Sequence, residues 1–203
     1  GSQHTCALIG LVKIQCWGDN AGGQLGDGNF TRRGIPVSVA GLNPGTTALA
    51  VGFAHSCALS EEGSVQCWGA NAYKQLGNDS TIGGGTPITV TGLSKISAIA
   101  AGEGFSCALS LGVQCWGTNF SGELGNGITS ESSLPVAVNA LVAKGIATGG
   151  FHACALGANS GVHCWGSNAF GQLGDENVGQ DNFNPIPLEV KGLSDDLVAI
   201  SAG

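Results

Sequence analysis

Eight cysteines are the residues of this chain whose spacing most clearly indicates chemistry. They form four local pairs, Cys6/Cys16, Cys57/Cys67, Cys107/Cys115 and Cys154/Cys164. Two cysteines directly opposed in an antiparallel hairpin lie within disulfide reach. Zinc sites usually place cysteines two to four residues apart, and no such pair occurs here. We therefore expect four disulfides, no metal site, and a secreted or cell-surface location, because disulfides persist in oxidising compartments.

The residues flanking the cysteines support this pairing. A hairpin that places Cys57 opposite Cys67 also places Leu59 opposite Val65, on the same face of the sheet. The same register holds in the other three pairs, although the third turn is two residues shorter. The spacing therefore predicts one disulfide-linked hairpin in each copy. Closing a loop of about ten residues stabilises the fold by about 2–3 kcal/mol in the chain-entropy model.

Histidines recur beside the cysteines. His4, His55 and His152 each precede a cysteine by two residues, but the third copy has Phe105 at this position. A position that accepts phenylalanine favours a packed side chain with a polar atom over a catalytic one. His163 replaces a glutamine of the other copies, and we expect it on the face opposite the cysteines.

Acidic residues gather in glycine- and asparagine-rich loops, where calcium binding is the alternative to simple solvation. They lack the spacing of a calcium-binding loop and vary between copies, so we expect solvated carboxylates at Asp27, Asp79, Asp175, Glu176 and Asp181. The sequence also contains no nucleophile elbow, zinc-protease, Walker A or dinucleotide motif. We expect no catalytic residues, no cofactor and no enzyme activity.

Charge and hydropathy each exclude one class of partner. The chain has seven basic and fourteen acidic residues, a net charge of −7. Nucleic-acid binding requires clustered lysines and arginines, and no apolar run approaches the roughly 20 residues that cross a bilayer. We expect neither a nucleic-acid partner nor membrane insertion.

Four copies of one unit position these residues, at approximately 1–51, 52–101, 102–148 and 149–203. Each repeat offers four short strands, for example at 46–51, 55–60, 64–68 and 87–91, the last with Pro87 at its start. The first of these is rich in small residues, which suits packing near an axis. Four strands in about 50 residues predict an all-β fold built from four-stranded antiparallel propeller blades, as a whole or partial propeller. The expected repeat core is Trp17, Trp68, Trp116, Trp165, Leu25, Leu76, Leu124 and Leu173.

Residues 55–77, HSCALSEEGSVQCWGANAYKQLG, carry nearly every element of a longer motif that all four copies share. This motif closely resembles the repeat of the regulator of chromosome condensation family. The resemblance implies a propeller, typically of seven four-stranded blades, that binds proteins through loops on one face. Family roles range from nucleotide exchange on a small GTPase with chromatin binding to secreted bacterial inhibitors of β-lactamases. The paired cysteines and acidic charge are similar to those of secreted bacterial relatives.

The ends of the chain fall within the repeat. Gly1 aligns with Gly52, Gly102, Gly149 and Gly203. The first hairpin therefore lacks an inner strand, and an inner strand expected at Leu197–Ala202 lacks a hairpin. We expect an excised or processed segment with three alternatives: part of a longer propeller, a closed four-bladed ring, or strand donation between molecules.

The function expected is binding of a protein or glycan outside the cytosol through loops at 27–34, 78–86, 126–133 and 175–184. One alternative is a structural protein that self-assembles by terminal strand exchange at a cell surface or in a filament. Another is a secreted enzyme inhibitor. Acceptor patterns for N-glycosylation occur at Asn29, Asn78 and Asn119.

Overall fold

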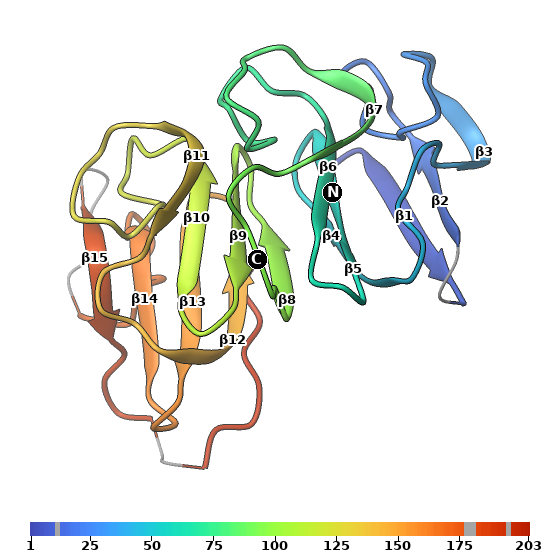
Figure 1. Ribbon diagram of the computed structural model, residues 1–203. Helices are drawn as coiled ribbons and strands as arrows, with labels where there is room; N and C mark the ends of the chain where they lie inside the picture. The colour runs from blue at the N-terminus through green and yellow to red at the C-terminus, as the bar shows by residue number, and fades with distance from the viewer. Residues whose placement is uncertain (11–12, 177–181, 194–195) are drawn as a thin grey trace.

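The computed structural model describes residues 1–10, 13–176, 182–193 and 196–203, and these form an all-β array of four antiparallel sheets (Figure 1). The first sheet is three-stranded and the other three are four-stranded. This confirms the expected class of fold. The strands of the first two sheets are β1 (His4–Ile9), β2 (Lys13–Gly18) and β3 (Arg33–Ser38), then β4 (Thr46–Val51), β5 (His55–Ser60), β6 (Val65–Gly69) and β7 (Gly84–Thr89). Those of the last two are β8 (Ala98–Ala101), β9 (Phe105–Leu109), β10 (Val113–Gly117) and β11 (Ser132–Ala137), then β12 (Ala143–Thr148), β13 (His152–Gly157), β14 (Val162–Ser167) and β15 (Phe183–Glu189).

Each sheet is one blade, numbered 1 to 4 along the chain, and its strands pair in chain order. The innermost strands are rich in alanine and other small residues, so they approach one another closely: β4 contacts β1 and β8, and β8 contacts β12. The second and third strands form the hairpin. In blade 2, Cys57 pairs with Cys67 and Leu59 with Val65.

Every hairpin carries a disulfide that joins its two strands, and the Cα atoms of each pair lie 4.1 Å apart. The sequence separation is ten residues in three of the pairs and eight in the third, whose turn is shorter. The pairs are the four that the spacing predicted: Cys6–Cys16, Cys57–Cys67, Cys107–Cys115 and Cys154–Cys164.

The outermost strands differ from expectation in where they begin. Strand β7 starts at Gly84, three residues before Pro87. Proline is tolerated inside it because β7 is an edge strand and its pairing with β6 shifts between Cys67 and Gly69. Pro87 falls in this irregular segment, where no ladder hydrogen bond requires its missing N–H.

The segment Leu197–Ala202 is not a strand, contrary to the sequence-based expectation. A strand is defined by its ladder partner, and the described residues place no hairpin strand beside this segment. Its side chains still occupy the corresponding place, because Leu197 and Ile200 pack against the core of blade 4.

Three of the four hydrophobic cores lie between blades, not within them. Ile14, Cys16 and Leu25 of blade 1 share a cluster with Ala58 and Trp68 of blade 2, and the next two junctions repeat this arrangement.

The disulfides belong to these cores. Cys115 is 0% exposed and lies in the cluster that blade 3 shares with Ala153 and Trp165 of blade 4. Cys164 is also buried, but blade 4 has no following blade, so its cluster is completed by Leu197 and Ile200 of the terminal segment. The first three disulfides thus pack in junctions, and the fourth packs at the end of the array.

The four blades follow an open arc, with the first and last blades at opposite ends (Figure 1). The closed four-bladed ring is thus not the arrangement that this structure adopts. Within the described part of the chain, no helical segment has the length and apolarity that crossing a lipid bilayer requires.

Candidate functional site: the loop face

In each blade a loop connects the hairpin to the outermost strand. These loops lie at one end of the blades, which we call the loop face. Its described residues are 19–32, 70–83, 118–131, 168–176 and 182, with the short turns before β5, β9 and β13. In Figure 1 these loops are at the top, and the hairpin turns lie at the opposite end. The loops expected to bind a partner therefore share one face. Residues 177–181 of the fourth loop, including Asp181, lie outside the described residues.

A buried asparagine organises every loop. The side chain of Asn71 is 2% exposed, and its Oδ1 accepts a hydrogen bond from the backbone N–H of Leu76 at 2.9 Å. Its Nδ2 donates to Ser80 O and Ile82 O, on the far side of the loop, at 2.9 and 3.2 Å. One side chain thus joins both ends of the loop, and Asn20, Asn119 and Asn168 take the same place in the other blades.

The turn after this asparagine joins each blade to the next. The carbonyl of Gln75 accepts hydrogen bonds from Trp116 Nε1 at 2.9 Å and Ser106 Oγ at 3.1 Å, both on blade 3. Gln24 accepts the same bonds from Trp68 and Ser56. The repeated tryptophans are therefore inter-blade anchors. Trp68, Trp116 and Trp165 are fully buried, whereas Trp17 is only partly buried, because no other described blade covers it. The repeated leucines Leu25, Leu76, Leu124 and Leu173 are at most 1% exposed.

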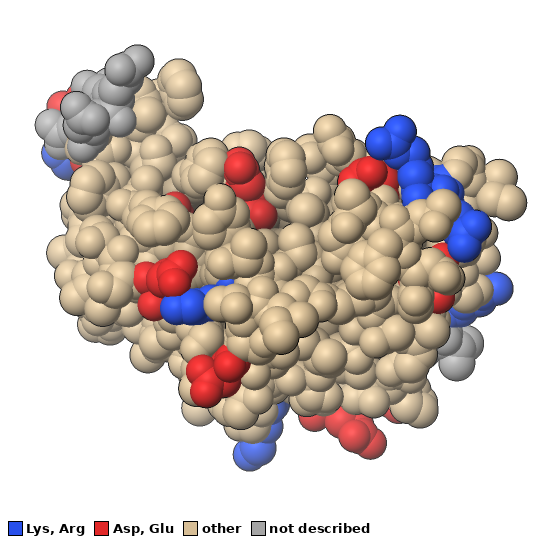
Figure 2. All heavy atoms as spheres, turned by 90° about the horizontal axis from the view of Figure 1, so that it is seen from above, with Lys and Arg blue, Asp and Glu red and all other residues tan. Residues whose placement is uncertain are grey.

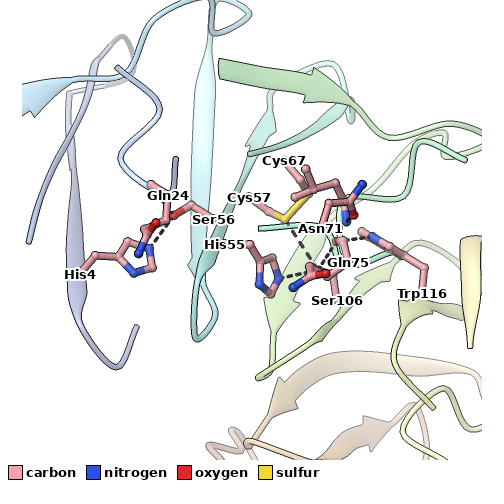
Figure 3. The surroundings of a disulfide bond; sticks show 11 residues. His4, Gln24, His55, Ser56, Cys57, Cys67, Asn71, Gln75, Ser106 and Trp116 are labelled. Carbon is pink, nitrogen blue, oxygen red and sulfur yellow. Dashed lines mark hydrogen bonds between the residues drawn. A yellow bond between two sulfur atoms is a disulfide. The ribbon is translucent and has the colours of Figure 1, made fainter. Parts of the chain in front are cut away.

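The recurring histidines complete this junction (Figure 3). His4 Nε2 lies 2.8 Å from Ser56 Oγ, and His55 Nε2 lies 2.9 Å from Ser106 Oγ. Since the serine hydroxyl donates its proton to a glutamine carbonyl, the histidine must be the donor to the serine, with its proton on Nε2. Burial lowers the pKa of His55 to about 3 and that of His4 to about 4. Both rings are thus neutral parts of the packing, not proton carriers near neutral pH.

Hydrogen bonds also join each loop to the outermost strand of the next blade. Gly28 N donates to Gly85 O of β7 at 2.8 Å, and Gly127 N donates to Pro185 O of β15 at 2.8 Å. Between blades 2 and 3, Ser133 Oγ of β11 donates to Asp79 Oδ1 at 2.7 Å. Each of these loops is thus held by the blade that follows it.

Exposed apolar side chains gather on this surface. They are Phe30, Phe53, Tyr73, Ile82, Phe120, Ile128, Phe151 and Phe170, each between 46% and 91% exposed. Figure 2 looks onto the loop face and shows a broad uncharged area with scattered acidic groups, and the largest gathering of basic groups lies at one edge. Aromatic enrichment with few charges characterises the centre of protein interfaces.

Three of the loop carboxylates, Asp27, Asp79 and Asp175, have protein partners. Asp27 Oδ1 accepts hydrogen bonds from Asn20 Nδ2 at 3.2 Å and Asn29 N at 3.1 Å, and its Oδ2 lies 3.4 Å from Arg33 Nε. Partial burial raises the pKa of Asp27, but these contacts outweigh it and the net pKa is lowered. Among the described residues, no cluster of three or more His, Cys, Asp or Glu side chains has the arrangement of a metal site.

The three glycosylation patterns have different surroundings. Asn29 is exposed and Asn78 is partly buried. Asn119, in contrast, is 0% exposed, and its Nδ2 donates to Ile128 O and Ser130 O at 2.9 and 3.0 Å. The expectation of an acceptor at Asn119 is therefore wrong for the folded chain, because this nitrogen is enclosed and holds the loop together.

The sequence analysis missed the two groups that shape this face, the buried asparagines and the exposed turn aromatics. The asparagines had a signal, since one follows each tryptophan by three residues. The aromatics had little signal, because only Tyr73 and Phe170 share a position of the repeat and the others occupy different ones.

Comparison with known families gives a consistent result. The family model described as "Regulator of chromosome condensation (RCC1) repeat" matches residues 14–59, 62–109, 112–156 and 159–203. Each match begins at or near the second hairpin strand of one blade and reaches the hairpin of the next blade, or the C-terminal segment in the last match. The matched unit therefore includes the contact between neighbouring blades.

Curated relatives match about half of the chain. Alsin of Rattus norvegicus is 36% identical over 105 residues, 48% of this chain and 6% of its own length. The mitochondrial RCC1 domain-containing protein RUG3 of Arabidopsis thaliana is 35% identical over 115 residues, 55% of this chain and 26% of its length. The human E3 ubiquitin-protein ligase HERC2 is 32% identical over 116 residues, 54% of this chain and 2% of its length. The chain thus matches about a quarter or less of each of these proteins.

Solved structures share the fold. Human WBSCR16 superposes with a TM-score of 0.88 at 24% identity, over 100% of this chain and 54% of that protein. Prp20p of Saccharomyces cerevisiae, described with its binding to Gsp1p and histones, gives a TM-score of 0.81 at 22% identity, over 99% and 52%. A yeast RCC1 (Prp20) bound to Kap60 gives 0.82 at 21% identity, over 100% and 50%. These similarities show that the arc of four blades has the curvature of those propellers.

Proposed function

The chain belongs to the regulator of chromosome condensation (RCC1) repeat family, and on that premise we propose that it is a non-enzymatic module that binds a protein outside the cytosol through its loop face. The observation that carries the proposal is the set of eight exposed apolar side chains on a loop face that hydrogen bonds anchor to neighbouring blades. Exposed aromatic groups on a rigid, charge-poor surface are expected to be covered by a partner.

A protein partner is favoured over a glycan by the likeness to propellers whose descriptions name protein partners, Kap60 in one case and Gsp1p with histones in another. The identity of those partners does not carry over, because this chain shares only 21–22% of their residues. Inhibition of a secreted enzyme would be one form of the same protein binding.

The location outside the cytosol rests on the four hairpin disulfides, which leave no free cysteine in the described chain. Disulfides at this density are rare in reducing compartments. Alkylation of free thiols under denaturing conditions, during lysis of the natural source, tests this. We expect that mass spectrometry finds no alkylated cysteine. Alkylation of most of the eight cysteines would contradict the proposal.

Protein binding is tested with two matched triple variants. Phe30, Phe120 and Phe170 are replaced by serine on the loop face, and Ile9, Leu111 and Val142 are replaced by serine at the opposite end. Proteins captured from the extracellular fraction by the native chain should also be captured by the second variant and lost by the first. Equal capture by both variants, or loss only in the second, would place binding elsewhere.

Self-assembly through the ends of the arc is the second candidate, and the two end faces favour it. Trp17 is only partly buried at one end, and Gln172, the counterpart of the 3%-exposed Gln75, is only partly buried at the other. Each end thus exposes residues that, at the other junctions, are covered by a neighbouring blade. That blade could come from the same polypeptide or from a second copy.

A further inference from the structure

A small pocket on the loop face brings together three aromatic side chains and one carboxylate. It has a volume of about 190 Å³. Its walls come from three successive blades and consist of Tyr73, Glu103, Gly104, Thr118, Phe120 and Phe151. The three rings are half-exposed or more, at 50%, 67% and 46% for Tyr73, Phe120 and Phe151. They are therefore available to a ligand and are not part of the core.

The glycine in the wall allows the close approach of the tyrosine. A Cβ atom placed on Gly104 would lie 3.1 Å from Tyr73 Cδ2 and 3.2 Å from Thr118 Cγ2. Any larger residue would push the tyrosine ring outward. The backbone of Glu103 is held as well, since Glu103 N donates to Gly150 O at 2.9 Å, beside Phe151.

The pocket exists at this one blade junction because the repeat varies there. At the preceding junction the places of Tyr73, Phe120 and Phe151 are taken by Gly22, Ala72 and Gly104, and the place of Glu103 by Phe53. The fold alone therefore does not produce this cluster of aromatic side chains. The cluster depends on the particular residues that blades 2, 3 and 4 carry at these positions.

No basic side chain of the described residues lines this pocket. The nearest lysine in the sequence, Lys74, instead pairs with Glu131, with 2.6 Å between Lys74 Nζ and Glu131 Oε1. The carboxylate and the electron-rich ring faces thus have no positive partner within the described chain, and the whole sequence has a charge of −7.

We propose that this pocket receives a cationic side chain, a lysine or its methylated form, from the protein partner. An ammonium group is attracted by the faces of aromatic rings, and methyl groups on it increase its contact with them. The carboxylate of Glu103 would add a full negative charge. The volume suits one side chain, because pockets for drug-sized molecules are about 300–1,000 Å³. This inference rests on the proposed function and names the chemistry of the partner.

The test uses the single tyrosine of the chain as a reporter. The full chain, labelled with 3-fluorotyrosine, gives one fluorine NMR signal from Tyr73. It is titrated with choline and, in parallel, with 3,3-dimethylbutanol, which has the same shape without the charge. A second pair is the blocked tripeptide Gly-Lys-Gly and its norleucine counterpart. We expect choline and the lysyl peptide to shift the signal saturably, with at least about tenfold weaker effects of the neutral compounds.

Two variants locate the binding. Glu103→Gln should weaken choline binding by about three- to fivefold, as expected for loss of one exposed charge. Leu111→Ala is the control, because Leu111 is 90% exposed and lies at the opposite end of the blades, outside the pocket. It should leave the titration unchanged.

Several outcomes would overturn the inference. Equal shifts from the neutral compounds would mean an apolar pocket, and the absence of a saturable shift would mean no site. Binding of choline without binding of the lysyl peptide or of its trimethyllysine form would mean a site for a small quaternary ammonium compound instead of a side chain. Partner capture by the loop face could survive each of these results, so failure here is distinguishable from failure of the proposed function.

Discussion

At the residue scale, the junction between blades 3 and 4 shows how the repeat tolerates substitution. The histidine of one blade bonds the serine of the next in the pairs His4/Ser56 and His55/Ser106. At the following junction both residues change together, to Phe105 and Ala153, and both are 0% exposed. Replacing both partners of a buried hydrogen bond by apolar groups is far less costly than removing one of them.

This substitution predicts the behaviour of the preceding junction. Ser106→Ala alone should lower the free energy of unfolding by about 1–3 kcal/mol, because the His55 N–H would be buried without an acceptor. The double change His55→Phe with Ser106→Ala should recover much of this loss, since it copies the pair found one blade later. Calorimetry on the two single variants and the double variant measures the coupling. Additive losses would contradict the pairing.

Acid should weaken the same junction. The folded-state pKa of His55 is about 3, below the ordinary value of 6.5, so the unfolded chain binds a proton between these pH values and the folded chain does not. Stability is then unaffected by this group above pH 6.5 and falls as the pH decreases toward 3, by up to about 1.4 kcal/mol per pH unit.

Unfolding at pH 7, 5.5 and 4.5 tests this against a matched control. The variant with both His55→Phe and Ser106→Ala lacks the buried histidine, so its stability should decrease less steeply below pH 6.5 than that of the native chain. Equal slopes for the two proteins would show that protonation of His55 does not contribute.

At the element scale, the turn that ends in Gly77 is the part of the blade that meets its neighbour. Gly77 has a φ of +68°, and a Cβ there would lie 2.7 Å from Val90 Cγ1 and 2.8 Å from Trp116 Nε1. Gly26 and Gly125 contact Trp68 and Trp165 in the same way. Glycine is therefore required both by the backbone conformation and by the indole of the next blade.

Two alanine substitutions separate these reasons. Gly92 also has a positive φ, +82°, but nothing lies within 4 Å of its Cβ position. Gly92→Ala should cost about 1–2 kcal/mol from backbone strain alone. Gly77→Ala should cost more and shift the tryptophan emission, because Trp116 must move. Calorimetry and fluorescence measure both effects, and equal costs would mean that the blade contact is adaptable.

At the scale of the whole molecule, the arc leaves one face of blade 1 and one face of blade 4 without a neighbouring blade. Leu197 and Ile200 cover part of the latter, while Val198 remains 92% exposed. An uncovered blade face with unpaired strand edges favours association.

Light scattering of the 203-residue chain measures this association. If the ends pair between molecules, the mass should be a multiple of 20.1 kDa, and deletion of residues 197–203 should reduce it to that of the monomer. A monomer at all concentrations would leave protein binding through the loop face as the sole candidate. Association that the deletion does not affect would exclude exchange of the terminal segment.

The sequence by itself determined the features that repeat locally. Hairpin register, four-stranded blades and the division into copies follow from alternation and spacing within about 50 residues, which is why the all-β propeller fold could be predicted. The cysteine pairs are of this local kind, since Cys107 and Cys115 are eight residues apart and Cys154 and Cys164 ten. The terminal segment Leu197–Ala202 shows the limit of this reasoning. Its residues match an inner strand, but strand formation depends on a partner that the local pattern does not supply.

Only the tertiary structure determined the contacts between blades. The bond between His4 and Ser56 joins residues 52 positions apart, and the pocket around Tyr73 combines three blades. The same holds for Asn119, whose acceptor pattern is readable in the sequence while its burial is not. A repeat specifies one blade, whereas the junctions depend on how far successive blades rotate and on which side chains then meet.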